Sequence, residues 1–454
     1  MISIYSFSGH GRRWELFMIA MKERKLDFAR AIIEPGSARG KRACLEESVM
    51  TNIIECDDRT IIDDLWQAGL HTTFAPEPLL AHAVKRGRMG LFWTILESYL
   101  DDEIWSIAGQ VAIECENLPL LDQLIARGTR PDDDNILQFA VLERPSMVRP
   151  LLERYRKVYP QGYARYGRVA INLAIDEYPK SSKILDIFFV FGLLDGEMLK
   201  GMGKCESPLY RAIGYGKYEY GAEHPRKDLI ERLLEACGDV NSILNGFDRH
   251  PARHELPGLR KPPRYIRAPH WISDGGGETS RATRTTALLR AIKTGNPEVV
   301  QLLIEKGAEV NKPAGQGIRR TPLQQAAEEN NVEIVKLLLE NNADVNAPPP
   351  KLEGATALQF AAIHGNCHMA MMLMDHGARL DVPPPIWPCG RWPLEGAAEH
   401  GRIDMIRLLW DLNNGPFDDQ QCQRAIRLAE INGHFGCRDM INELSGRPPI
   451  QYEI

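Results

Sequence analysis

The feature that most limits how this chain can fold is a pattern that recurs about every 35 residues near its C-terminal end. Aligned copies begin at Thr285, Thr321, Thr356 and Trp392, and a looser copy begins at Arg424. The matching apolar positions, which are 35, 35, 36 and 32 residues apart, are Leu288, Leu323, Leu358, Leu394 and Ile426. Four successive matches with the same internal order predict a stack of repeated units in place of separate globular domains.

Each copy has the pattern of two helices joined by a turn. The threonine at the start is suited to cap the first helix, and Pro322 and Pro393 suit the first helical position, where no N–H is needed. A second run with helical apolar spacing follows, as between Val299 and Ile304. One such pair cannot bury its apolar face alone, so the copies are expected to stack into a solenoid. Pairs of small residues would let neighbouring first helices approach closely; these are Ala326–Ala327, Ala361–Ala362 and Ala397–Ala398.

Glycine or asparagine stands wherever one of these helices is expected to end. Glycine adopts the left-handed conformation at the end of a helix without steric cost, and asparagine is the residue that tolerates it next best. The predicted ends of the first helices are Gly295, Asn330, Gly365 and Gly401, and those of the second helices are Gly307, Asn342 and Gly377.

These residues resemble ankyrin repeats, whose pattern is a Thr-Pro-Leu-His turn and helix, followed by a Gly-Ala-Asp-Val-Asn turn. The histidine is missing from every copy, and its place is taken by Leu289, Gln324, Gln359 and Glu395. This departure affects the hydrogen bonds that the histidine would make, not the fold. The resemblance implies an all-α, ankyrin-type helical-repeat solenoid with projecting turn fingers. It also implies that partner proteins bind to the concave face and the finger turns.

Weaker copies continue toward the N-terminus, where the spacing is less regular and few turn glycines remain. The expected segments are 1–75, a helical N-terminal region; 76–241, degenerate repeats; 242–282, a basic proline-rich insertion; 283–441, well-formed repeats; and 442–454, a C-terminal tail. The first segment is either more degenerate repeats or a separate helical domain. With every copy counted, the chain would hold up to twelve helix pairs, interrupted once.

Composition limits the class of partner and the cellular compartment that we expect for this protein. The 454 residues carry 55 Lys and Arg against 61 Asp and Glu, a net charge of −6, which disfavours nucleic acid as a partner of the whole chain. The nine cysteines include no Cys-x-x-Cys pair, which is typical of reduced, intracellular thiols. The longest apolar run, Ile184 to Leu194, contains Asp186 and is too short to span a bilayer. We expect a cytoplasmic or nuclear monomer that has no membrane partner.

The insertion 242–282 is the largest departure from the repeat. Between Asp248 and Ile272 it carries six Lys or Arg against two acidic residues, with Tyr265 and Trp271 among them. Five prolines in the same stretch disfavour a long helix. One interpretation is an arm that binds an acidic partner or, less readily, RNA or DNA. The other is a solvated loop without a binding role.

Two proline-stiffened fingers, 347–355 and 382–392, and one charged turn are the other candidate contact sites. An exposed tryptophan on a rigid support is typical of an interface hot spot, which favours Trp387 and its neighbour Ile386. Trp392 occupies the threonine slot of its repeat, so it either packs on the next repeat or binds a partner. The turn before Thr321 offers Ile318, Arg319 and Arg320, whose guanidinium groups either meet carboxylates of a partner or remain solvated.

The sequence contains no recognised catalytic or phosphate-binding motif. Spacings that could suit a metal occur at His364, Cys367 and His368 and at His250 and His254, but each lacks a second ligand pair nearby. We therefore assign no catalytic, cofactor-binding or metal-binding residues. The favoured function is a non-enzymatic protein-interaction scaffold. The alternatives are a regulatory adaptor, whose N-terminal region recruits a ubiquitin ligase, a transcription factor or an enzyme, and, third, an enzyme.

Overall fold

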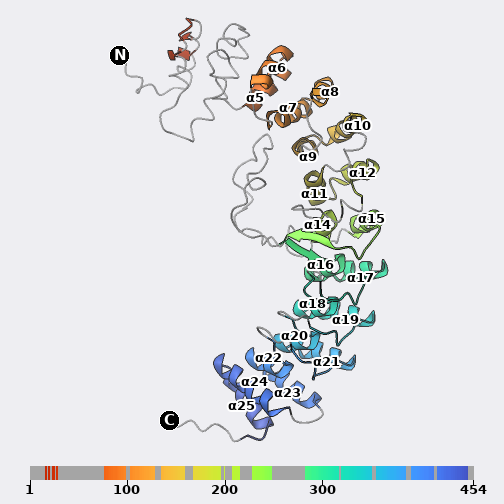
Figure 1. Cartoon of the computed structure of the whole chain (residues 1–454), viewed down its shortest axis with the longest axis vertical. Helices are drawn as coiled ribbons and strands as arrows, with labels where there is room; N and C mark the ends of the chain where they lie inside the picture. The colour runs from red at the N-terminus through yellow and green to blue at the C-terminus, as the bar shows by residue number, and fades with distance from the viewer. Residues whose placement is uncertain are drawn as a thin grey trace. The chain divides into compact units, whose positions relative to one another are not determined.

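Figure 1 draws the computed structural model of the chain. The chain forms two compact units. One comprises residues 1–193 with 255–277, and the other comprises residues 194–254 with 278–454. The residues whose structure is described are 16–17, 19–20, 23–25, 27–28, 76–98, 103–127, 134–158, 167–195, 199, 207–214, 227–247, 282–315, 318–349, 354–384, 390–413 and 417–447. Across these ranges the fold is all-α, as predicted, and the only strands among them form one two-stranded sheet.

The first unit consists of helix pairs. They are α5 (Pro76–Lys85) with α6 (Met89–Ser98), α7 (Glu103–Glu114) with α8 (Leu118–Arg127), α9 (Asp134–Glu143) with the 3-10 turn η3 (Pro145–Met147) and α10 (Val148–Val158), and α11 (Arg168–Asp176) with α12 (Ser182–Val190). The first helices of successive pairs pack on one another, and α7 is buried over most of its length. Gly109 makes the α7–α9 approach possible, because a Cβ atom at this position would collide with the side chain of Ile136.

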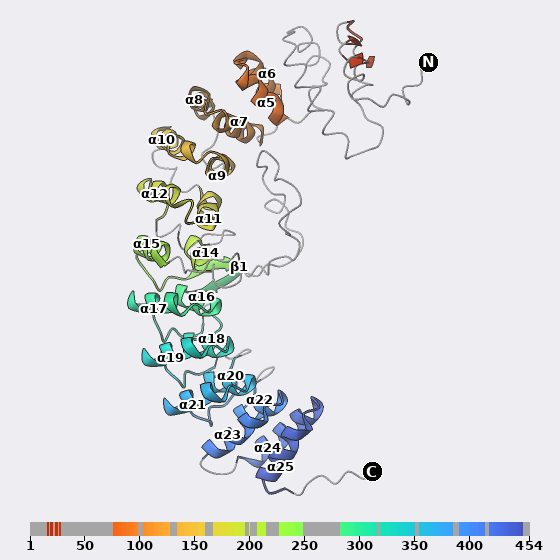
Figure 2. The same ribbon diagram turned by 180° about the vertical axis from the view of Figure 1, so that it is seen from behind.

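The second unit holds helix pairs of the same kind and one β-ribbon. In order they are α14 (Pro208–Gly214) and α15 (Lys227–Cys237); β1 (Leu244–Phe247) and β2 (Ala282–Thr285); α16 (Ala287–Thr294) and α17 (Pro297–Glu305); α18 (Pro322–Glu328) and α19 (Val332–Glu340); α20 (Ala357–His364) and α21 (Cys367–Asp375); α22 (Pro393–Glu399) and α23 (Ile403–Leu412); α24 (Asp419–Ile431) and α25 (Phe435–Leu444). The even-numbered helices form one layer and the odd-numbered helices the other (Figure 2). We call them the first-helix and second-helix layers.

Strands β1 and β2 lie on either side of the insertion predicted from the sequence. They pair antiparallel, with Leu244 opposite Thr285 and Phe247 opposite Ala282. The ribbon therefore brings the two ends of the insertion together immediately before α16. The interior of the insertion, and with it Tyr265 and Trp271, lies outside the described residues.

The predicted helix ends and the threonine caps of α18 and α20 are confirmed, whereas α16 is capped by Thr286, one residue after the expected Thr285. The hydroxyls of Thr286, Thr321 and Thr356 accept the backbone N–H three residues later, and prolines open α18 and α22. The predicted glycines adopt positive φ, and so do Asn330 (54°) and Asn342 (59°). The alanine pairs of α18, α20 and α22 have no exposed surface, which places the close contacts between first helices where the sequence predicted them.

A ladder of asparagines joins the turn of each repeat to the turn of the next. Asn241, Asn311 and Asn346 occupy the same position in successive repeats. The amide of Asn311 donates to the carbonyl of Asn342 (2.9 Å) and accepts the N–H of Asp344 (2.7 Å). The other two asparagines make the same pair of bonds, Asn241 to Gly307 and Glu309, and Asn346 to Gly377 and Arg379.

The ladder ends at Asp381, which takes the place of the next asparagine. A carboxylate cannot donate a hydrogen bond, and Asp381 instead forms a two-bond ion pair with Arg379 (2.8 and 2.9 Å). The hydrogen bonds from Arg379 lower the pKa of Asp381.

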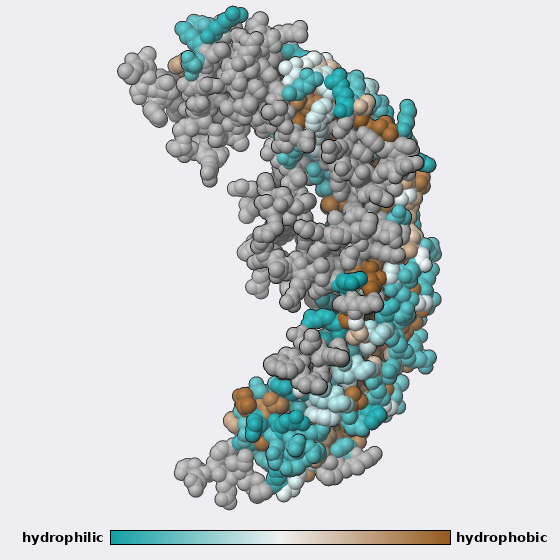
Figure 3. Space-filling view, in the orientation of Figure 1, coloured by the Kyte–Doolittle hydropathy of each residue, from teal (hydrophilic) through white to brown (hydrophobic). Residues whose placement is uncertain are grey.

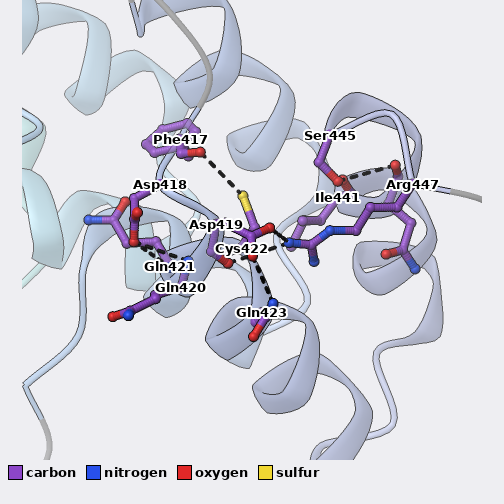
Figure 4. A network of polar contacts seen from close by, with 11 residues as sticks. Phe417, Asp418, Asp419, Gln420, Gln421, Cys422, Gln423, Ile441, Ser445 and Arg447 are labelled. Atoms are coloured by element: carbon purple, nitrogen blue, oxygen red, sulfur yellow. Dashed lines mark hydrogen bonds and ion pairs between the residues drawn. The ribbon is translucent and has the colours of Figure 1, made fainter.

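The last helix pair is closed by polar contacts of its own (Figure 4). Asp418 caps α24 by accepting the N–H groups of Gln420 and Gln421. Arg447, just beyond α25, pairs with Asp419 at the start of α24. The end of the second helix is thus tied to the beginning of the first.

The ladder predicts that Asn346→Asp destabilises the protein by about 1 kcal/mol, because the donor to the Gly377 carbonyl is lost and an anion faces that oxygen. Urea unfolding monitored by circular dichroism measures the change. Asn432→Asp is the matched control, since the Asn432 side chain bonds only to its own helix, at Leu428. Equal effects of the two substitutions would show that the ladder contributes nothing specific.

Candidate protein-interaction surface

Two positions per repeat lie on one face of the first-helix layer of the second unit, where all but Phe360 and Gly396 are half-exposed or exposed. In the described repeats the earlier position holds Arg211, Arg290, Gln325, Phe360 and Gly396, and the later one holds Gly214, Lys293, Glu328, Ile363 and Glu399. We call these positions the first-helix strip. The two positions are three residues apart, so they lie on the same face of each helix.

Within the strip, large and small residues of adjacent repeats complement one another. The Arg290 side chain lies against Gly214 of the preceding repeat, where a Cβ atom would collide with the guanidinium. Farther along, Ile363 lies against Gly396, where a Cβ atom would be only 2.9 Å from the isoleucine Cγ1. The side chain exposed at one repeat therefore depends on the residue that its neighbour carries.

Glutamines fill the role of the histidine that the repeat pattern lacks. Gln324 accepts the N–H of Thr321 through its amide oxygen, and its amide nitrogen donates to the carbonyls of Ala347 (2.9 Å) and Pro348 (3.2 Å). Gln359 repeats this arrangement, with its amide nitrogen on the carbonyl of Val382 (3.2 Å). Each glutamine thus anchors the base of a proline-stiffened finger to the first helix of the same repeat, α18 for Gln324 and α20 for Gln359.

A buried carboxylate, Glu395, occupies the same position in α22. It accepts the backbone N–H of Trp392 (3.2 Å), and Arg424 of the next repeat lies 2.9 Å from it in an ion pair. Burial is the main influence and raises the pKa of Glu395, while the Trp392 N–H and Arg424 act in the opposite direction. The folded protein holds this proton more tightly than the unfolded chain does. The contribution of protonated Glu395 to the stability of the fold is therefore full at low pH, and it is lost as pH rises through the raised pKa.

Two arginines that precede first helices form ion pairs within the chain. Arg320 binds Glu328 through both guanidinium ends (2.8 and 2.6 Å), and Arg391 binds Glu399 in the same way (2.6 and 3.1 Å). The guanidinium of Arg320 also lies 5.0 Å from the centre of the Phe360 ring. The Arg391 pair fastens the end of the finger 382–392 to α22, and the Arg320 pair fastens the turn before α18 to that helix.

The structure places the residues that the sequence singled out in different settings. Ile318 is buried, Arg320 is buried and paired with Glu328, and Arg319 between them is exposed. Arg320 was expected to meet a partner's carboxylate or to be solvated; the structure gives it an internal carboxylate instead. Trp392 is half-buried at the N-cap of α22. Trp387 and Ile386 lie outside the described residues.

Arg391 and the glutamates that complete the two ion pairs were not predicted from the sequence. A signal was present, because an arginine directly before the helix and a glutamate eight residues later occur in both repeats. His364, considered as a metal ligand, instead places its Nε2 atom 2.8 Å from the carbonyl of Glu328. The described part of the chain holds no group of three or more His, Cys, Asp or Glu side chains arranged to bind a metal.

Comparison with known protein families supports the repeat assignment. A family model of ankyrin repeats in three copies matches residues 270–349. The chain therefore contains ankyrin repeats. The asparagine ladder shows that the same turn geometry continues on both sides of the match, from Asn241 to Arg379. No curated protein sequence matches the chain. Over the described residues, every helix is too short or too polar to cross a bilayer.

The environment of Glu395 predicts that Glu395→Gln stabilises the ankyrin stack near neutral pH by up to about 1 kcal/mol, because the amide keeps the bond to Trp392 without a buried charge. The gain should shrink as pH falls through the raised pKa of Glu395, because the native glutamate then becomes protonated. Thermal unfolding from pH 4 to pH 8 measures this dependence. Glu340→Gln, at an exposed position, is the control. A gain that did not change with pH would contradict the assignment.

The Arg320 pair predicts a difference between neighbouring arginines. Arg320→Ala should lower the free energy of unfolding by about 2 kcal/mol, because Glu328 loses its partner and the Phe360 ring its cover. Arg319→Ala at the exposed neighbouring position should change it by less than about 0.5 kcal/mol. Chemical denaturation of both variants provides the comparison, and similar values for the two would refute the structural role of Arg320.

Proposed function

We propose that this chain is a non-enzymatic scaffold that binds partner proteins through the first-helix layer and the fingers beside it. Ankyrin repeats generally mediate protein–protein interaction, and this supports the proposal. We place the protein in the cytoplasm or nucleus, in keeping with its cysteine content.

The observation that carries the proposal is a division of roles between positions of the repeat. The positions that hold the stack together, namely the caps, alanine pairs and ladder asparagines, recur from repeat to repeat. At its half-exposed and exposed positions the first-helix strip instead changes from Arg290 and Lys293 through Gln325 to Ile363. A stack that needed only stability would not require this variety at its surface. Differing side chains on a rigid framework are suited to recognising a specific partner.

The fingers 347–355 and 382–392 extend this surface. Their bases are fixed by Gln324 and Gln359, which limits the entropy lost when a partner binds. We propose Trp387 as the main anchor of the second finger, with Ile386 and Trp392 beside it, and Arg319 as a contact on the exposed turn before α18.

Affinity purification with quantitative mass spectrometry tests the scaffold. In the full-length chain, Trp387→Ala should reduce recovery of at least one partner about tenfold, as expected for a hot-spot tryptophan. Met371→Ala is the control, because this exposed side chain lies on α21 in the second-helix layer. Unchanged recovery of all partners with Trp387→Ala would remove the finger from the interface. Failure of the native chain to retain any protein would remove the scaffold function itself.

The division into two compact units supports a second candidate, a regulatory adaptor whose N-terminal unit recruits a second factor. Cross-linking mass spectrometry of the full-length protein in its complexes distinguishes the two. An adaptor should show different partners cross-linked to the two units, whereas a single scaffold surface should show the same partners on both.

A further inference from the structure

The first three repeats of the second unit concentrate positive charge on one layer. Over α14, β2, α16, α18 and the turn before α18, the described residues include six cations and two carboxylates. They are Arg211, Arg284, Arg290, Lys293, Arg319, Arg320, Glu328 and Glu329. Arg320 is paired with Glu328. The sequence of the insertion that the β-ribbon closes is also basic.

Arg290 is held in place by its neighbours. Its guanidinium lies 4.0 Å from the centre of the Tyr210 ring, a distance typical of a strong cation–π contact. Tyr210 is only 2% exposed, and Gly214 leaves the space that the arginine occupies. Stacking and packing therefore hold the charged group in one place before any partner arrives.

Arg290 has no carboxylate partner among the described residues, unlike Arg320 and Arg391. Its guanidinium makes no hydrogen bond or ion pair there, and its Nε atom is buried without an acceptor. A buried donor left without an acceptor is unfavourable, and an acidic group that approached the exposed end of the guanidinium would neutralise the charge. Arg290 is thus an anion-binding group that the fold orients but does not satisfy.

The basic stretch is bounded within the strip. Glu328 and Glu329 end it at α18, and Phe360 and Ile363 follow on α20. Burial raises the pKa of Glu329, while Lys293 acts to lower it, which places this carboxylate near the edge of the positive region.

The second-helix layer of the same repeats has the opposite character. Helices α15, α17 and α19 carry seven carboxylates against three cations, and Figure 3 shows mainly hydrophilic residues over α17 and α19. A protein with a net charge of −6 therefore has a limited basic surface on one layer only. Charge of this kind attracts and orients an acidic partner.

We propose that an acidic segment of a partner protein binds along the first-helix strip over α14, α16 and α18, with its carboxylates on Arg290 and Lys293. This rests on the proposed scaffold function and names the chemistry of the partner. The stretch is short, is flanked by carboxylates and apolar side chains, and belongs to an acidic chain. These features suit a peptide better than a long phosphodiester backbone.

Fluorescence anisotropy of a labelled oligoglutamate peptide with the full-length protein tests the proposal. Arg290→Glu and, separately, Lys293→Glu should each weaken binding about fivefold or more, and Arg290→Lys should weaken it less. Lys336→Glu on α19 is the matched control, because it changes the same charge on the opposite layer. Lys293 is exposed, so its variant remains informative even if the Arg290 variants fail to fold. Oligoglutamine serves as the uncharged probe.

Zero-length carbodiimide cross-linking locates the bound peptide. The coupling joins a peptide glutamate to a lysine amine with loss of water, and the adduct should lie on Lys293 in preference to Lys336. Unchanged affinity in both glutamate variants, adducts confined to lysines outside the strip, or tighter binding of oligothymidylate than of oligoglutamate would each overturn the proposal. None of these results would affect the scaffold function, which fails only if the native chain retains no partner protein.

Discussion

The structure of the second unit depends on the burial of helix faces between adjacent repeats. A pair such as α18 and α19 is too small to form a core of its own, so its apolar residues are buried only when another pair lies on each side. The alanines of the first helices have no exposed surface, and Ile334, Val335 and Leu338 of α19 are equally buried. Stability is therefore shared along the stack, and a defect in one repeat weakens both of its neighbours.

Polar contacts determine how the repeats are aligned once their faces are buried. The asparagine ladder joins turn to turn, and the glutamines join helix to finger, so backbone groups at the edges of the stack are satisfied by the adjoining repeat. Two positions differ from this pattern. Asp381 replaces an asparagine and turns to Arg379, while Glu395 replaces a glutamine and depends on Arg424. Both lie toward the C-terminal end of the array, before the looser copy that begins at Arg424.

Arginines at the surface illustrate how neighbours decide what a charged side chain can do. Arg320 and Arg391 precede first helices and find glutamates eight residues later, so their charge is used within the fold. Arg290 lies inside a helix and stacks on Tyr210, and it has no carboxylate partner in the described part of the chain. The same type of side chain is thus paired within the fold in two places and stacked on an aromatic ring in the third.

Much of the second unit was predictable because its determinants are local. Thr321 and Thr356 cap helices, and Asn330 and Asn342 adopt left-handed conformations, through interactions within a few residues of each position. The periodic spacing then indicated a stack. The degenerate repeats were harder to delimit, because they contain few of these local signals.

The sequence by itself determined the repeat, the helix ends and the all-α fold, because short-range hydrogen bonds and backbone preferences specify them. Only the tertiary structure decided which surface residues are satisfied within the chain. Arg320 pairs with Glu328 of the helix that follows it, while its cover, the Phe360 ring, comes from the next repeat. Whether Arg290 stacks on Tyr210 depends on a glycine far away in the sequence, Gly214. The contacts with Phe360 and Tyr210 have no local signature, since they exist only once neighbouring repeats are in register.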